Sequence, residues 1–398
     1  MEETARSTPA QTSRGSRLHD ASNLIIQLLF FSLILSLLFS QILFYILILL
    51  CIVDFLGGCR ARREIPLFGY FLTAFIVLRS LSVPVSVAPG LSVAAIPKLI
   101  TALLFFALIH FIRDARDIEK STRLLFISAV LASLYGLFIY FTGRTERAHS
   151  FTGGYTTLGV FLASTIAFQL VHPRETKTFL PKAAWVSGLA ATIFGLFFTF
   201  TRGAWTALIL SVLLAAFLAR KKLLVAIPIL IALVLLVPPL RERALTLKDP
   251  LTHSTQRVTI WSEGMRLISE KPLEGHGLGT FRKIYPNLAG LQDKRVRNWH
   301  NDFLQVGVES GILTLLCYFM FLASLLTQGF SLGLKKENRD RGLALSLSAS
   351  LFCLVVSSVF GTVLLDPTLS LLFWGLTGAL GFVVSARGLR GKARLPRE

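Results

Sequence analysis

Charged residues are scarce in this chain, and acidic ones most of all. Only 16% of its 398 residues are charged, with 22 acidic side chains against 41 basic ones. Soluble globular domains carry about 25% charged residues. Here 53% of the residues are hydrophobic, so the composition excludes an ordinary soluble domain and favours a membrane protein.

Cysteine is also rare, and its four positions lie within apolar runs or at their inner ends, at Cys51, Cys59, Cys317 and Cys353. We therefore expect neither a disulfide nor a thiolate metal site. The sequence also lacks a close carboxylate pair of the hydrolase kind and a His/Asp/Glu cluster with metal-ligand spacing. No small-residue cleavage site follows a short apolar core near the N-terminus, so we expect no cleaved signal peptide.

Long apolar runs are abundant instead. A helix of about 20 apolar residues crosses the hydrocarbon core of a membrane. The runs predict an all-α polytopic integral membrane protein with about twelve transmembrane helices. We place them at residues 22–38, 41–57, 66–83, 91–112, 122–143, 154–171, 182–200, 203–219, 223–240, 301–328, 342–364 and 367–386.

Basic residues gather in alternate connections of this arrangement. Of the 41 lysines and arginines, 25 lie in the two tails and in the loops near residues 60, 117, 177, 221 and 338. The positive-inside rule makes that side the cytoplasm, and the net charge of +19 then requires no nucleic acid.

The same rule predicts a multi-pass membrane protein that divides into five parts. These parts are a cytoplasmic tail at 1–21, helices one to nine at 22–240, an outward loop with short helices at 241–299, helices ten to twelve at 300–386 and a cytoplasmic tail at 387–398.

Two loops on the predicted outer side carry more basic than acidic residues, contrary to the positive-inside rule. The loop 241–299 holds eleven basic and six acidic residues, and the short loop 144–153 contains Arg144 and Arg147. Anionic membrane lipids are one explanation for this excess. A phosphate-bearing ligand is the other, because the planar guanidinium fork of arginine suits phosphate oxygens.

Three more cations lie at or inside the outer membrane boundary: Arg79, Lys98 and Arg202, the last within "TRGAW". Cations at membrane depth are costly and suggest a functional role. Snorkelling to the nearby surface is the alternative for Arg79, but three cations at one depth on one side favour a shared anionic ligand.

Within the large loop, "STQRVTIWSEGMRLISEKP" predicts a helix from Thr255 to Glu270. Helical spacing gives it an apolar face of Val258, Trp261, Met265 and Ile268, suited to the membrane surface. Pro272 ends it. The following "EGHGLG" is not a dinucleotide-binding motif, because no strand precedes it and no helix follows directly. We expect a glycine turn against the membrane.

The stretch "RNWHNDFLQVGVESG" places a histidine at the mouth of the tenth span. Asn298 or Asn301 can cap the helix, so His300 lies near its positive end, where a neutral imidazole is favoured and can accept a proton. A capping or interfacial histidine is the alternative. Gly307 and Gly311 are spaced for close helix packing, and Glu309 is interpreted as a structural carboxylate.

At this point the chain resembles the bacterial O-antigen ligase and polymerase superfamily. "HNDFLQVGVESGILT" carries His300, Asn301, Gly311 and Thr314 at the spacing of that family. "TRGAW", "QRVTIW" and "GHGLG" resemble its other recurrent pieces in the same order. The twelve-span layout with one large periplasmic loop before the histidine also agrees, and the resemblance covers about residues 60–385.

The resemblance implies a glycosyltransferase that moves a glycan from undecaprenyl diphosphate to lipid A core at the periplasmic face, without metal or nucleotide. It implies that His300 is the general base and that Arg202 and Arg257 bind the diphosphate. Arg144, Arg147 and Lys98 are added to the diphosphate ligands by their placement, as is Arg79. Asn301 and Gly311 are expected to support the site.

Three other functions remain open at the level of the sequence. A polymerase of the same superfamily would extend a glycan still attached to its lipid carrier. A protein-glycosylating ligase would share these motifs. A transporter or lipid flippase is more remote, because it favours broken helices and polar groups at mid-membrane in repeated halves.

Overall fold

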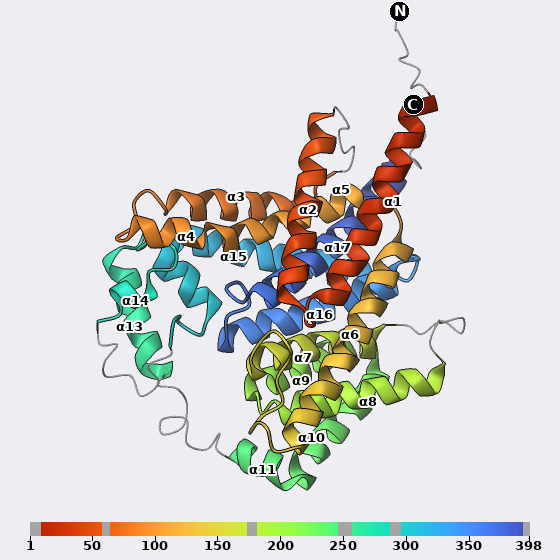
Figure 1. Ribbon diagram of the computed structural model, residues 1–398, viewed down its shortest axis with the longest axis vertical. Helices are drawn as coiled ribbons and strands as arrows, with labels where there is room; N and C mark the ends of the chain where they lie inside the picture. The colour runs from red at the N-terminus through yellow and green to blue at the C-terminus, as the bar shows by residue number, and fades with distance from the viewer. Residues whose placement is uncertain (1–8, 58–63, 173–180, 246–256, 287–295, 393–398) are drawn as a thin grey trace, which may run out of the picture.

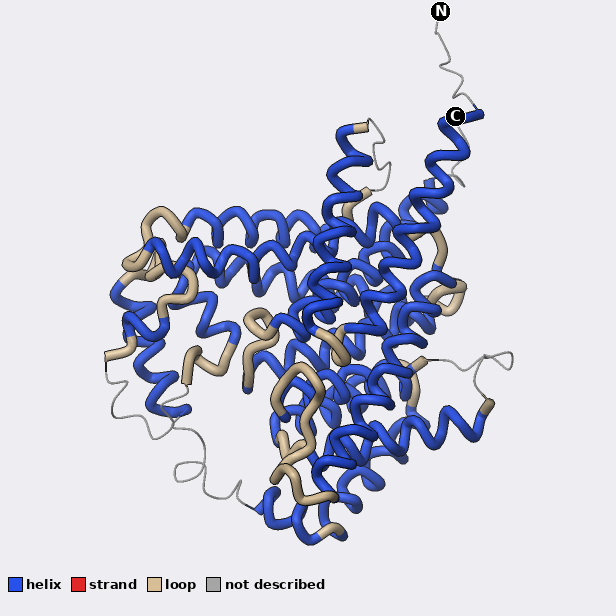
Figure 2. Tube along the Cα trace, viewed as in Figure 1, coloured by secondary structure: helices blue, strands red, loops and turns tan. Residues whose placement is uncertain are grey.

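The computed structural model describes residues 9–57, 64–172, 181–245, 257–286 and 296–392 of the chain. These residues form helices and loops, and no strand occurs among them (Figure 2). The all-α prediction is therefore confirmed for the described part of the chain.

Each of the twelve predicted apolar runs is mostly helical, but the run 22–38 crosses a turn at residues 33–36. The helices of the first two thirds are α1 (Pro9–Ser32), α2 (Leu37–Leu56), α3 (Leu67–Leu81), α4 (Pro89–Ile100), α5 (Leu104–Phe111), α6 (Ala115–Phe141), α7 (Tyr155–Val171), α8 (Lys182–Phe198), α9 (Arg202–Leu218), α10 (Ala226–Leu236) and α11 (Pro238–Leu245), with 3-10 turns η1 (Thr101–Leu103) and η2 (Lys221–Val225). The remaining helices are α13 (Arg257–Glu270), α14 (Phe281–Ile284), α15 (Asp302–Leu334), α16 (Arg341–Phe360) and α17 (Pro367–Lys392).

Six described segments are long and apolar enough to cross a membrane, namely Leu37–Leu56, Pro89–Phe111, Ala115–Phe141, Asp302–Leu334, Arg341–Phe360 and Pro367–Ala386. Four further apolar helices, α3, α7, α8 and α9, are shorter. The chain is therefore a multi-pass membrane protein.

The helix bounds differ from the predicted spans at several ends. Helix α1 begins at Pro9, inside the predicted tail 1–21, and α17 continues to Lys392. The predicted span 223–240 divides between α10 and α11, and the division comes just before Pro238 and Pro239. The bounds differ because helical hydrogen bonds continue into polar residues, whereas an apolar run marks only the part of a helix that is suited to lipid.

Helix α15 lies at the centre of the packing. Helix α15 packs on α3 and on α16, and α16 in turn packs on α7 and α9 (Figure 1). Buried serines allow close approach: Ser164 of α7 and Ser350 of α16 share a 2.7 Å hydrogen bond, and the Ser211 hydroxyl donates to the Ala349 carbonyl at 2.6 Å. Small polar residues at helix interfaces are typical of membrane bundles.

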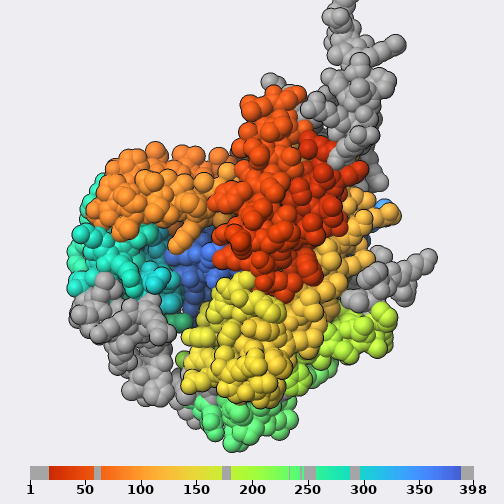
Figure 3. Space-filling view, viewed as in Figure 1, coloured from red at the N-terminus to blue at the C-terminus, as the bar shows by residue number. Residues whose placement is uncertain are grey.

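Helices α13 and α14 lie to one side of the bundle, apart from the group formed by α6 to α11 (Figure 1). The space-filling view shows the surface hollowed between these two parts, with C-terminal residues between them (Figure 3). The candidate site residues come from the segments that border this hollow.

Candidate functional site

The turn before α15 presents His300 in an uncommon backbone conformation. Its φ is +51°, a left-handed value that non-glycine residues adopt only where their surroundings fix it. The Asn298 side chain accepts the His300 N–H at 3.0 Å. The Asn301 side chain accepts from the Phe303 and Leu304 N–H groups at 2.9 and 3.1 Å. The capping role predicted for Asn298 or Asn301 thus falls to Asn301.

An aromatic cluster holds this turn from the loop side. Trp299 is fully buried, and its ring centroid lies 4.8 Å from that of Phe281 and 6.1 Å from that of Tyr285. The Trp261 indole of α13 donates to the Trp299 carbonyl at 3.0 Å. Helices α13 and α14 therefore fix the position of the residue next to His300.

Helix α13 has apolar residues on two sides. Ile260, Leu267 and Ile268 are buried and pack on the turn before α15. Val258 and Met265 of the predicted apolar face are 57% and 62% exposed, which suits a face that meets the membrane surface. The placement of that face at the membrane surface stays a prediction.

One pocket, here called the arginine pocket, encloses about 290 Å³ and contains four predicted site residues: His300, Arg147, Arg202 and Arg257. They come from separate parts of the chain: the loop before α7, the starts of α9 and α13, and the turn before α15. Asp366 is the one acidic residue among its described lining.

The arginines of this pocket are placed to receive an anion. The Arg147 guanidinium carbon lies 4.4 Å from the centre of the Tyr155 ring. Arg202 is the first residue of α9, after a turn in which Phe200 has a φ of +53°, so the positive helix end adds to its charge. The Arg257 Nε is buried and has no hydrogen-bond partner among the described residues.

The charges of these arginines act on one another. Burial lowers the pKa of Arg257, and repulsion from Arg202 lowers it further, while Tyr155 opposes the change. Like charges collected in a partly buried site are costly without a counter-ion. A bound phosphate would relieve that cost through charge-assisted hydrogen bonds.

Asp366 was not among the predicted site residues. Its carboxylate accepts from the Thr157 hydroxyl at 2.5 Å and from the Thr368 and Leu369 N–H groups at 3.0 Å each. Burial raises the pKa of Asp366, and these hydrogen bonds oppose the rise. The sequence signal was the order Asp366, Pro367, Thr368, which is typical of a helix start.

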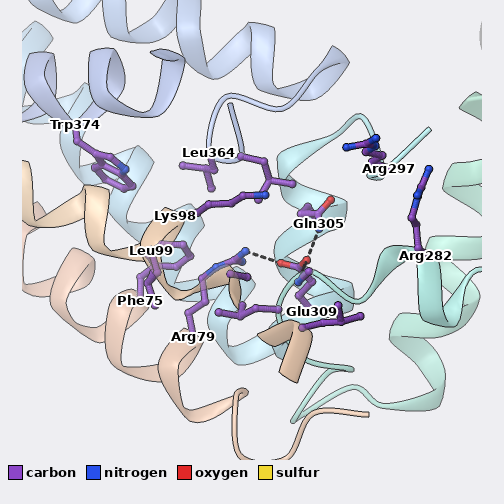
Figure 4. A pocket seen from close by; sticks show the side chains of 15 residues that line it. Phe75, Arg79, Lys98, Leu99, Arg282, Arg297, Gln305, Glu309, Leu364 and Trp374 are labelled. Carbon is purple, nitrogen blue, oxygen red and sulfur yellow. Dashed lines mark hydrogen bonds and ion pairs between the residues drawn. The ribbon is translucent and has the colours of Figure 1, made fainter. Parts of the chain in front are cut away.

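The second pocket, here called the Arg79 pocket, encloses about 260 Å³ and contains Lys98 and Arg79 together with Arg282 and Arg297 (Figure 4). Arg79 is only 6% exposed, and its Nη2 donates to Glu309 Oε2 at 2.6 Å. The structure thus divides five of the six predicted phosphate ligands between two pockets. Arg144 lines neither of them and lies 5.4 Å from the centre of the Phe138 ring.

Glu309 has the structural role expected of it. Besides the Arg79 ion pair, its carboxylate accepts from the Gly279 N–H at 2.6 Å and from the Gln305 side-chain amide. It therefore joins α3, the glycine turn and α15. No group of three or more His, Cys, Asp or Glu placed to hold a metal occurs within the described ranges.

The predicted span 301–328 implied a continuous helix in which Gly311 serves helix packing. Gly311 instead interrupts α15. Its φ is +79° and its ψ 175°, and a Cβ there would lie 2.2 Å from the Leu273 carbonyl oxygen. The Ile312 N–H donates to the Pro272 carbonyl at 2.7 Å instead of to the preceding helical turn. Only glycine combines this conformation with such a close approach.

The glycine turn completes the interrupted helix. The His276 and Gly277 N–H groups donate to the Val308 and Glu309 carbonyls at 2.9 and 2.8 Å. These carbonyls are the ones that the break at Gly311 leaves without helical partners. The placement of this turn against the membrane surface stays a prediction, and its residues His276 and Leu278 are buried against protein.

Two comparisons with known proteins bear on this geometry. Residues 187–319 match a family model described as O-antigen ligase. This segment is about one third of the chain and contains Arg202, Arg257 and His300. No curated protein matches the chain.

Proposed function

The chain belongs to the O-antigen ligase superfamily through its residues 187–319, and from this membership we propose that it is an O-antigen ligase. It would transfer a glycan from undecaprenyl diphosphate to lipid A core oligosaccharide at the periplasmic face of the inner membrane. The observation that carries the proposal is the arginine pocket, where His300 lies with Arg147, Arg202 and Arg257.

The proposed reaction needs only a base and cations. His300 takes the proton of an acceptor hydroxyl, and the hydroxyl oxygen forms a bond to the anomeric carbon of the donor glycan. The bond from that carbon to the diphosphate oxygen breaks, and undecaprenyl diphosphate leaves with the electron pair. Arg202 and Arg257 bind the charge that develops on the leaving group. Arg147 is a third cation at the same place.

The proposal includes a topology of twelve spans with both tails in the cytoplasm and 241–299 in the periplasm. It can be tested with single cysteines at two exposed lysines, Lys283 on α14 and Lys336 after α15, in a cysteine-free background. In intact spheroplasts, an impermeant thiol reagent should label Lys283→Cys and spare Lys336→Cys. The opposite pattern would reverse the orientation.

The activity itself is tested by deleting the gene and analysing lipopolysaccharide. A ligase is expected to leave bare core in lipopolysaccharide and accumulate lipid-linked polymer. Short single-unit chains on the core would instead identify a polymerase. Unchanged lipopolysaccharide with loss of glycan from proteins would identify a protein-glycosylating ligase.

A further inference from the structure

The Arg79 pocket has its own excess of positive charge. Its described lining contains four cations, Arg79, Lys98, Arg282 and Arg297, and one acid, Glu309. The Lys98 side chain reaches across the pocket toward the side of Gln305, and the Arg282 and Arg297 side chains lie on the opposite side from Arg79 (Figure 4).

The buried ion pair leaves part of this charge available. The Arg79–Glu309 contact uses Nη2 of the guanidinium, while Nη1 is buried and has no hydrogen-bond partner among the described residues. The Glu309 carboxylate already accepts from Arg79, Gln305 and Gly279. A buried donor without a partner is costly, and an anion in the pocket would supply its acceptor.

The two pockets share a thin wall. Val363 lines the arginine pocket, and the next residue, Leu364, lines the Arg79 pocket. Asp302, the second residue after His300, fixes this wall, because its Oδ2 accepts both the Val363 and Leu364 N–H groups at 2.9 and 3.1 Å. A molecule held in the Arg79 pocket therefore lies next to the pocket that contains His300.

We infer that the Arg79 pocket binds an anionic group of the phosphate class on the acceptor saccharide, while the arginine pocket binds the donor diphosphate. The identification of one ligand as the acceptor and the other as the donor rests on the proposed function. The anion site itself rests on the unpartnered Arg79 nitrogen and on Lys98 and Arg297, which line the same pocket. Separate sites for two anions keep their charges apart and place the acceptor hydroxyl beside the base.

Binding can be measured without turnover. The full chain in neutral phosphatidylcholine nanodiscs is dialysed against labelled glucose 6-phosphate or against glucose. Glucose 6-phosphate should bind more tightly than glucose, and Lys98→Gln or Arg297→Gln should weaken it by about 10- to 100-fold, as expected for loss of one charged hydrogen bond. Lys283→Gln, an exposed cation on α14 outside the pocket lining, is the matched control.

Three binding outcomes would overturn the inference. Equal binding of glucose and glucose 6-phosphate removes the anion site. Parent-like binding by Lys98→Gln and Arg297→Gln, with loss in Arg257→Gln, assigns the anion to the other pocket. Displacement of glucose 6-phosphate when phosphatidylglycerol is added to the nanodiscs makes a membrane lipid headgroup the occupant.

A transfer assay then tests the acceptor. With a phosphorylated acceptor, Lys98→Gln should raise the acceptor KM about tenfold and leave the donor KM unchanged, and it should have little effect with the dephosphorylated acceptor. A raised donor KM alone would overturn the assignment. If the parent transfers no glycan, the proposed function fails, while the dialysis result still decides whether the anion site exists.

Discussion

Arg79 of α3 and Glu309 of α15, 230 positions apart in the chain, meet in an ion pair of 2.6 Å. Their side chains are only 7% and 1% exposed. The pair joins α3 to the helix that begins at the candidate site. Because both charges are buried, removing one leaves the other without compensation.

We therefore expect Glu309→Ala to lower the free energy of unfolding by about 3–5 kcal/mol. Arg79→Leu combined with Glu309→Leu should recover much of that loss, because no lone charge stays buried. The exposed ion pair between Arg266 and Glu270 on α13 is the control, and Arg266→Ala should have a much smaller effect because solvent screens exposed charges. Unfolding of the purified variants in mild detergent gives these values. Equal losses at both pairs would contradict the prediction.

The sequence predicted local features well and long-range ones poorly. Apolar runs and the cap at Asn301 depend on neighbouring residues, so the helices and the start of α15 follow from them. Other features depend on how helices that are far apart in the sequence pack together. These features are the contact of Arg79 with Glu309 and the placement of Arg202 in the same pocket as His300. The signal for Asp366 was visible as a helix start, but only the fold places it beside Thr157.

Gly311 shows the same limit within one helix. The spacing of Gly307 and Gly311 favoured helix packing, but the backbone of Gly311 is left-handed and touches Leu273. We expect Gly311→Ala to lower the free energy of unfolding by at least about 1–3 kcal/mol, the usual cost of such a conformation for a residue with a Cβ. Gly90→Ala is the control, because a Cβ there meets nothing within 4 Å. A parent-like stability of Gly311→Ala would show that the kink is not required.

His172, just after α7, should make stability depend on pH. Its pKa is lowered from 6.5 to about 4, mainly by burial and also by the nearby charges of Arg220 and Arg123. The unfolded chain takes up a proton at this residue near pH 6.5 and the folded chain does not, so stability is lost as the pH falls from 6.5 toward 4. Thermal unfolding at pH 7.5 and pH 5 should show a smaller loss for His172→Gln than for the parent. The same loss in both proteins would mean that other groups control the acid response.

Arg202 and Arg257 should be needed for donor binding in the transfer reaction. We expect Arg202→Ala and Arg257→Ala to lower kcat/KM by about 10- to 100-fold each, the loss of one charge-assisted hydrogen bond. Lysine should restore activity only in part, because it lacks the bidentate fork. Arg266→Ala is a matched control on the same helix as Arg257. Transfer at the parent rate by both alanine variants, at equal protein levels, would make these arginines structural.

His300 should be the residue whose loss affects the chemical step most. Its φ of +51° and the hydrogen bond from its N–H to Asn298 fix the turn that brings it into the arginine pocket. A positioned general base contributes about 100- to 10,000-fold to the rate. We expect His300→Ala to lose transfer by that factor while it still binds the lipid-linked donor, since the arginines remain. His300→Gln should not restore the rate, because an amide cannot take up the proton. Single-turnover transfer and donor binding, measured on the same purified variants, separate the two effects. Rapid transfer by His300→Gln would leave the histidine a positioning role only, and loss of donor binding in His300→Ala would place it among the diphosphate ligands instead.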